Sequence, residues 1–375
     1  MDAPISMSRP DNTTEDRQAV CRTDPEIGLL ARCREWTDIF PWLRMNRVMR
    51  MVGSPFLLLF VAAILFSWFK GVSLLLQEEF RYQLLTRGSE VSVVGHVQEL
   101  TEWMKFAYQV NPSTMMLSGE RLNSWRWLAS GLWTLLIWSV PSLVLVRQGA
   151  VLTAGRGMES ISTTFSVALR RFWPAFAATV LIFSSPTLIA ILIWVINAIH
   201  HYLPAQTMLY WPCVLVLILL STIGGLLVLA SNFVLPLSLG AIVSESYPDP
   251  IDSASRGYES CFRRPLRILG YLMVLAFLLI AVFLIASGIS WCAERLLFVA
   301  VGAFQTDSGP LIKGVATGLR LLPCTFVVTL FWGAVGSFYL LLRRDACEQE
   351  IEEIWMPAPK ETISLPRLDT SKSES

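Results

Sequence analysis

The chain has 375 residues, of which 54% are hydrophobic and only 16% carry a charge. Soluble domains carry charge on about 25% of their residues, because a water-exposed surface needs polar cover. The composition therefore excludes a soluble globular protein and predicts a polytopic membrane protein. The net charge of +1 excludes a nucleic-acid-binding role, which needs a basic surface to neutralise phosphates.

Residues 1–35 are polar and mix acidic with basic side chains, which predicts a disordered cytoplasmic tail. The first 50 residues contain no apolar segment typical of a signal peptide, so we expect the first span itself to direct membrane insertion. Residues 36–344 form the predicted membrane domain. Residues 345–375 are expected to form a second cytoplasmic tail.

Six apolar stretches are long enough to cross a hydrocarbon core of about 30 Å, which takes about 20 helical residues. The predicted fold class is therefore an all-α integral membrane protein with about six transmembrane helices. The predicted spans cover about 55–76, 127–146, 173–200, 209–243, 266–290 and 321–342. The fourth stretch is longer than one span needs, and we interpret it as a helix to about Phe233 with a tilted or interfacial extension after Pro236. Lys70 is interpreted as the one charged residue within a span, reaching the interface by snorkelling.

Arginines gather in the loops on one side of these spans. They are Arg44, Arg47, Arg50, Arg147, Arg156, Arg170, Arg171, Arg256, Arg263, Arg264, Arg267, Arg343 and Arg344. Because Lys and Arg in short loops favour the cytoplasmic side, this pattern predicts a multi-pass protein of the cytoplasmic (inner) membrane. With an even number of spans, both termini are expected to be cytoplasmic.

Two segments resemble each other at a constant offset of 93 residues: ESISTTFSVALRR at 159–171 and DSASRGYESCFRR at 252–264. Apolar residues recur in both at helical spacing, which predicts two cytoplasmic amphipathic helices. We interpret them as part of a parallel internal repeat that relates spans 2–3 to spans 4–5. The alternative is that the arginines only reflect the positive-inside rule. The candidate cytoplasmic interface consists of Phe165, Arg170, Arg171, Tyr258, Arg263 and Arg264.

A third basic amphipathic stretch, FPWLRMNRVMRMV at 40–52, precedes the first span. Trp42, Met45 and Met49 share one helical face and the arginines project from the other. This arrangement suits a helix at the headgroup level of the membrane. A simple collar that sets topology is the alternative.

Three segments, FPWLRMNRVMR, PIDSASRGYESCFRRPLRILGY and YLLLRRDACEQEIEEIW, occur in this order between residues 36 and 355. In these segments the chain resembles a family of uncharacterised polytopic membrane proteins of planctomycete bacteria. The resemblance implies a fold and a location, and it implies no activity.

Two places near the middle of predicted spans carry helix-breaking residues: Pro186 in the third span, and Gly224 with Gly225 in the fourth. Broken helices at the midplane form the substrate site of many transporters. Pro and Gly also occur in ordinary membrane helices, where they allow kinks and close packing. These residues are therefore candidate helix breaks.

The sequence contains no P-loop, nucleophile elbow or HExxH pattern, and its seven cysteines have no metal-ligand spacing. We therefore expect no catalytic, cofactor or metal site. The preferred function is a non-catalytic envelope component that binds membrane lipids, and a protein partner or a second copy of the chain. The alternatives are a transporter or permease subunit and a membrane enzyme that acts on lipid.

Overall fold

The computed structural model describes residues 36, 40–76, 125–202, 206–263, 265–303, 309–347, 351 and 354–356. The predicted N-terminal tail, most of the predicted C-terminal tail and Arg264 lie outside the described residues. Every regular element in the described ranges is helical, so the predicted all-α fold is confirmed.

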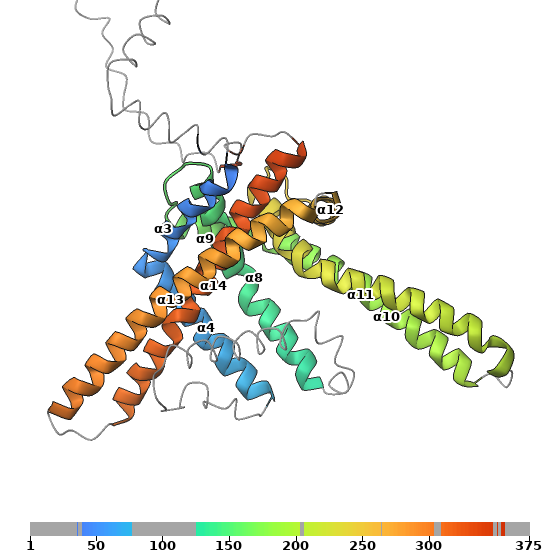
Figure 1. The fold of residues 1–375 in the computed structure, drawn as a ribbon, viewed down its shortest axis with the longest axis horizontal. Coiled ribbons are helices and arrows are strands. Elements are labelled where there is room, and N and C mark those ends of the chain that lie inside the picture. The colour runs from blue at the N-terminus through green and yellow to red at the C-terminus, as the bar shows by residue number, and fades with distance from the viewer. Residues whose placement is uncertain are drawn as a thin grey trace, which may run out of the picture.

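Six helices are long and apolar enough to cross a membrane, as predicted. They are α4 (Pro55–Leu76), α8 (Trp125–Thr153), α10 (Phe172–Tyr202), α11 (Gln206–Ser244), α13 (Pro265–Ala303) and α14 (Pro310–Cys347). They pack in chain order as three pairs, α4 with α8, α10 with α11 and α13 with α14, and the pairs diverge from one end of the molecule (Figure 1). Helix α14 also contacts α4, α8 and α11 and is the most buried of the six.

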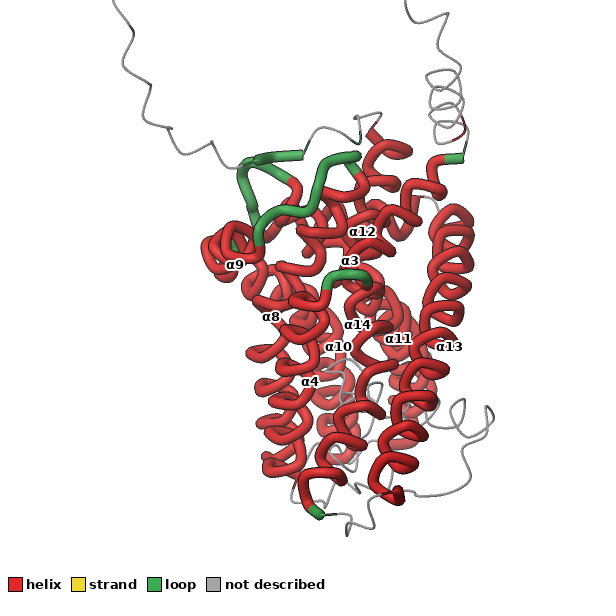
Figure 2. Tube along the Cα trace, turned by 90° about the vertical axis from the view of Figure 1, so that its left-hand side faces the viewer, coloured by secondary structure: helices red, strands yellow, loops and turns green. Residues whose placement is uncertain are grey.

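Four short helices lie at the end where the pairs meet, which we call the capped end; the opposite end is the open end (Figures 1 and 2). They are η1 (Pro41–Val48), α3 (Met49–Val52), α9 (Ile161–Arg170) and α12 (Pro250–Arg263). Each pair of spans therefore follows a short helical segment with an arginine in its last turn: Arg50, Arg170 or Arg263. The fold thus consists of three units of the same order.

Local sequence signals explain where these helices begin. A proline stands at the first position of five of them: Pro41, Pro55, Pro250, Pro265 and Pro310. Proline suits this position because its fixed φ is helical and its missing N–H would have no partner there. Ser160 caps α9 by accepting a hydrogen bond from the Thr163 amide at 3.3 Å, and Asp249 accepts one from the Ile251 amide at 3.1 Å.

The element ends agree with the 93-residue offset seen in the sequence. Helix α9 ends at Arg170 and α12 at Arg263, while the next spans begin at Phe172 and Pro265. The capping residues differ, however, because Ser160 precedes α9 whereas the corresponding Ser253 is buried inside α12. The duplication itself stays a prediction.

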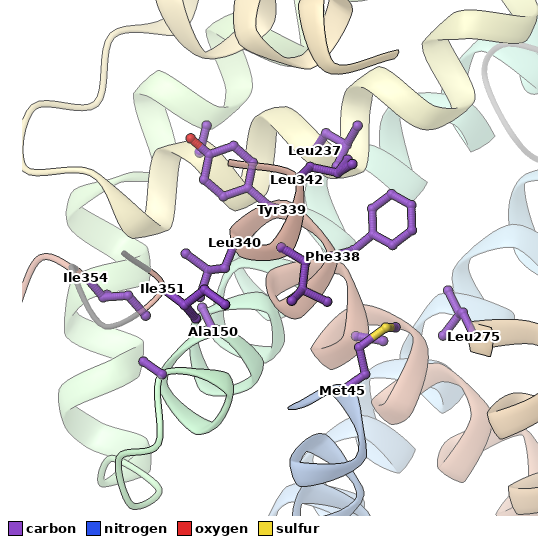
Figure 3. Packing of buried hydrophobic residues seen from close by; sticks show 14 of the residues in the cluster. Met45, Ala150, Leu237, Leu275, Phe338, Tyr339, Leu340, Leu342, Ile351 and Ile354 are labelled. Atoms are coloured by element: carbon purple, nitrogen blue, oxygen red, sulfur yellow. The ribbon is translucent and has the colours of Figure 1, made fainter. Parts of the chain in front are cut away.

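Helices α8 and α14 approach each other at the level of their backbones. A Cβ atom on Gly149 would lie 1.8 Å from the Gly333 carbonyl oxygen, and one on Gly336 would lie 2.2 Å from the Val146 carbonyl oxygen. Small residues permit such contacts between membrane helices, where van der Waals packing drives association. Around this contact, side chains of η1, α11, α13 and α14 form the core at the capped end (Figure 3).

Four helices extend further than the sequence predicts. Helix α11 is continuous to Ser244 through Pro236, because a membrane helix tolerates the single hydrogen bond that proline removes. Helix α8 continues past Val146 to Thr153, and α13 past Ser290 to Ala303. Helix α14 begins at Pro310 and ends at Cys347, beyond both ends of the span predicted at about 321–342. The reading of Lys70 as the one charged residue within a span is therefore wrong. The helical spans also contain Arg147, Arg267, Glu294, Arg295, Arg320, Arg343, Arg344 and Asp345.

Candidate functional site at the capped end

A buried arginine organises the capped end. Arg147, on α8, is 1% exposed and uses all five N–H donors of its guanidinium. Two go to the Glu159 carboxylate, from Nε at 3.3 Å and Nη2 at 2.9 Å. Nη1 donates to the carbonyl oxygens of Val243 at 2.9 Å and Trp355 at 2.7 Å, and Nη2 also contacts Met356 Sδ at 3.1 Å. Arg147 therefore ties α8 to the end of α11 and to the chain beyond α14.

The chain beyond α14 folds back onto this arginine. Ile351 and Ile354 are buried against Ala150 and Leu340, and Trp355 and Met356 follow (Figure 3). We call Ile351, Ile354, Trp355 and Met356 the C-terminal strap. Its contacts hold it against the capped end by apolar burial and by the hydrogen bond from Arg147.

Arg171, at the junction of α9 and α10, lies beside Arg147. It is 4% exposed and donates from Nη1 to the Ile242 carbonyl oxygen. The ring of Trp355 covers it, with the ring centroid 4.2 Å from Arg171 Cζ and 5.7 Å from Arg147 Cζ. Burial, together with the neighbouring Arg147, lowers the pKa of Arg171 to about 10.

These contacts satisfy the C-terminus of α11, whose last carbonyl groups have no partner within the helix. Ile242 accepts from Arg171, Val243 accepts from Arg147, and Ser244 accepts from the Trp355 amide at 3.0 Å. Cations at this end also interact favourably with the helix dipole. The two arginines and the strap therefore act together as the cap of α11.

A second set of interacting polar side chains begins at Glu245, directly after the end of α11. Glu245 accepts a hydrogen bond from the Tyr339 hydroxyl at 2.7 Å and pairs with Arg256 of α12. Arg256 also pairs with Asp252 at 2.9 Å. Although burial lowers it, the hydrogen-bonded Asp252 and the nearby Glu245 raise the pKa of Arg256 above its ordinary value. This group fastens α12 to α11 and α14.

The predicted interface residues lie in different environments. Arg170 is exposed, and Arg263 is exposed and pairs with Glu259 at 2.8 Å. Phe165 is 40% exposed. Arg171 is instead buried, which corrects the expectation that it belongs to the surface. Its burial follows from the carbonyl groups of α11 and the Trp355 ring, and sequence reasoning missed both.

Tyr258 reaches one of the candidate helix breaks. Its hydroxyl lies 3.3 Å from Ser185 Oγ on α10. Pro186 lacks the N–H that would bond to the Ile182 carbonyl, and the Ser185 hydroxyl donates to that oxygen at 3.0 Å. Helix α10 consequently stays α-helical through Pro186, so the predicted break does not form.

The glycines of the fourth span likewise leave α11 continuous. A Cβ on Gly224 would lie 3.0 Å from Ile189 Cγ2 of α10, so Gly224 marks the close packing of this pair. A Cβ on Gly225 would have no heavy atom within 4 Å. Neither glycine breaks the helix.

A separate ion pair lies toward the open end. Glu294 of α13, 6% exposed, accepts from Arg320 Nε of α14 at 3.0 Å. Next to it, the Ser290 hydroxyl donates at 2.7 Å to the Leu319 carbonyl. Within α14 that carbonyl would accept from the amide of residue 323, but Pro323 has no N–H. Ser290 of α13 supplies the hydrogen bond instead.

The capped-end groups are guanidinium, carboxylate, phenol and indole groups, so their chemistry is ion pairing and hydrogen bonding. Within the described ranges, no three His, Cys, Asp or Glu side chains gather as a metal site. The fold and this capped end define a multi-pass α-helical integral membrane protein. Comparison of the chain with protein-family models, curated proteins and solved structures finds no match.

Proposed function

We propose that the protein is a non-catalytic component of the bacterial inner membrane whose capped end faces the cytoplasm and binds membrane lipids and a protein partner. The observation that carries this proposal is the composition of the capped end. Exposed aromatic and apolar side chains stand there beside exposed arginines. The apolar ones include Trp42, Trp173, Ile251, Phe262 and Leu266, and the arginines include Arg50, Arg170 and Arg263.

Aromatic rings beside cationic side chains are typical of the layer where a membrane meets water. Trp173 and Leu266 are 72% and 82% exposed, and each lies at the first turn of a span, next to the arginine that ends the preceding short helix. Each arginine near an anionic leaflet contributes about 1 kcal/mol of attraction. Such side chains hold α9 and α12 at the headgroup layer.

The cytoplasmic orientation is supported by the arginines of the capped end, under the rule that basic residues stay inside. The resemblance to a planctomycete family supports the bacterial inner membrane. A non-catalytic role is supported by the partners of the capped-end arginines. The buried Arg147 and Arg171 and the partly exposed Arg256 all hold helix ends or carboxylates of the same chain.

A transporter or permease subunit is the second candidate. One observation favours it: Tyr258 of α12 contacts Ser185 beside Pro186, so a movement of α12 would reach the turn of α10 in which proline removes a backbone hydrogen bond. A partner that binds α12 would then act on a span. A membrane enzyme acting on lipid has no such support in the described residues.

The test compares lipids retained after purification in a maltoside detergent, measured by native mass spectrometry. The variant Arg170→Gln/Arg263→Gln removes two exposed cations of the capped end. The matched control Arg295→Gln removes an exposed cation of α13 toward the open end. We expect the first variant to lose bound anionic lipid and the control to keep it.

Equal lipid retention by both variants would contradict the proposal. Partners recovered by affinity purification are compared on the same samples. The permease candidate gains support if Pro186→Ala changes the solute content of cells while bound lipid and recovered partners stay unchanged.

A further inference from the structure

Arg171 is a buried positive charge that lies beside a second one. Among the described residues, no carboxylate lies within ion-pair distance of its guanidinium, whereas Arg147 pairs with Glu159. Removing a cation from water costs several kcal/mol unless an anion or good hydrogen bonds compensate it. The contacts of Arg171 are one carbonyl oxygen and one aromatic ring. Arg171 is therefore a buried cation that no described carboxylate contacts directly, and Glu245 attracts it only from a distance.

The C-terminal strap supplies acceptors in the place where an anion would lie. The ring of Trp355 covers both guanidinium groups. The backbone carbonyl oxygen of Trp355 and the Sδ atom of Met356 each accept an N–H from Arg147. All of these are neutral acceptors.

We propose that Arg147 and Arg171 form a binding site for a phosphate group, and that the C-terminal strap closes this site when it is empty. Two adjacent guanidinium groups match the geometry of phosphate, whose oxygens accept paired N–H donors. Arg171 directly precedes the first residue of α10, so the site lies where a span meets the headgroup layer. In this placement the proposal rests on the proposed function. The phosphate belongs to a lipid headgroup or is free in solution.

The test uses the full chain in phosphate-free maltoside micelles and follows hydrogen exchange of the Trp355 amide. That amide donates to the Ser244 carbonyl, so it exchanges slowly while the strap is closed. We expect added inorganic phosphate, or phosphatidylglycerol in mixed micelles, to accelerate its exchange. Diacylglycerol, which lacks phosphate, is the lipid control. A response to phosphatidylglycerol alone identifies a lipid headgroup, and a response to inorganic phosphate identifies a free anion.

The variants compared are Arg171→Gln, which removes the buried cation, and Arg295→Gln, which removes an exposed cation of α13 toward the open end. We expect Arg171→Gln to abolish the response and Arg295→Gln to keep it. Size-exclusion profiles of both establish that they fold. If neither phosphate source changes the exchange, or if Arg171→Gln responds as the unmodified protein does, the proposal is overturned.

A change in the strap provides a second measurement that leaves both arginines in place. Trp355→Ala removes the covering ring, so phosphate affinity in equilibrium dialysis is expected to rise about tenfold, the order of a desolvated cation–π contact. Trp355→Phe keeps an aromatic face and should bind like the unmodified protein. An unchanged affinity in Trp355→Ala would refute closure by the strap. This outcome is separate from the lipid-retention test, which changes only exposed arginines.

Discussion

Gly149 of α8 faces Gly333 of α14 so closely that a Cβ on Gly149 would lie 1.8 Å from the Gly333 carbonyl oxygen. The atom in the way is backbone, which has no rotamer to move aside. This contact brings α8 against the central helix at the residue that follows Arg147 and Gln148. The position of the polar groups at the capped end therefore depends on the absence of two side chains.

Gly149→Ala should consequently destabilise the protein. Overpacking of a well-packed core costs roughly 1–3 kcal/mol, and here the two helices must separate to admit the methyl group. Gly225→Ala is the matched control, because a Cβ there meets open space. Thermal unfolding in detergent should show a lower midpoint for Gly149→Ala only. Equal midpoints would mean that α8 and α14 are further apart than described.

The positions of the spans and of the arginine-ended helices are predictable from the sequence because both depend on local composition. The cap of α11 is not, since it joins residues of α8, the α9–α10 junction and the C-terminal strap. Only the tertiary fold brings Arg147, Arg171 and Trp355 together. The length of α13 was also missed, because Glu294 looks like a loop residue until Arg320 is placed beside it.

The Arg147–Glu159 pair yields a second prediction. Glu159→Gln leaves the buried Arg147 guanidinium without its carboxylate, and breaking a buried pair costs roughly 3–5 kcal/mol. We expect a large fall in the unfolding midpoint. The control is Glu259→Gln, which removes the carboxylate of the exposed pair with Arg263, where the expected cost is about 0–1 kcal/mol. Similar midpoints for the two variants would show that Arg147 is solvated.

Ser290 and Pro323 should be energetically coupled. Ser290→Ala removes the donor to the Leu319 carbonyl, and hydrogen bonds between membrane helices are worth about 0.6 kcal/mol on average. Pro323→Ala supplies a backbone N–H for the same oxygen. In a double-mutant cycle, Ser290→Ala should therefore cost less in the Pro323→Ala background. Additive effects would show that the two donors do not serve one carbonyl.

The orientation of the protein is tested by reporter fusions. Fusions at residues 160 and 255, at the capped end, should report the cytoplasm, and fusions at residues 205 and 305, which follow α10 and α13 in the sequence, the opposite side. The reason is that the capped end is rich in arginine, and loops rich in Lys and Arg stay on the cytoplasmic side of the membrane. A cytoplasmic signal at residue 205 would contradict the six-span orientation.

Cysteine labelling tests whether α9 packs against α8 through one face. Thr163 is exposed, whereas its neighbour Thr164 is fully buried and accepts a hydrogen bond from Gln148 Nε2 at 2.9 Å. In a background without other cysteines, Thr163→Cys should react readily with a membrane-impermeant maleimide in inside-out vesicles, and Thr164→Cys should react slowly. Burial also raises the pKa of the Cys261 thiol on α12, so restoring Cys261 alone should give slow labelling near neutral pH, because the thiolate is the reactive form. Equal rates at positions 163 and 164 would mean that α9 does not dock, and the bond between Gln148 and Thr164 would then be absent.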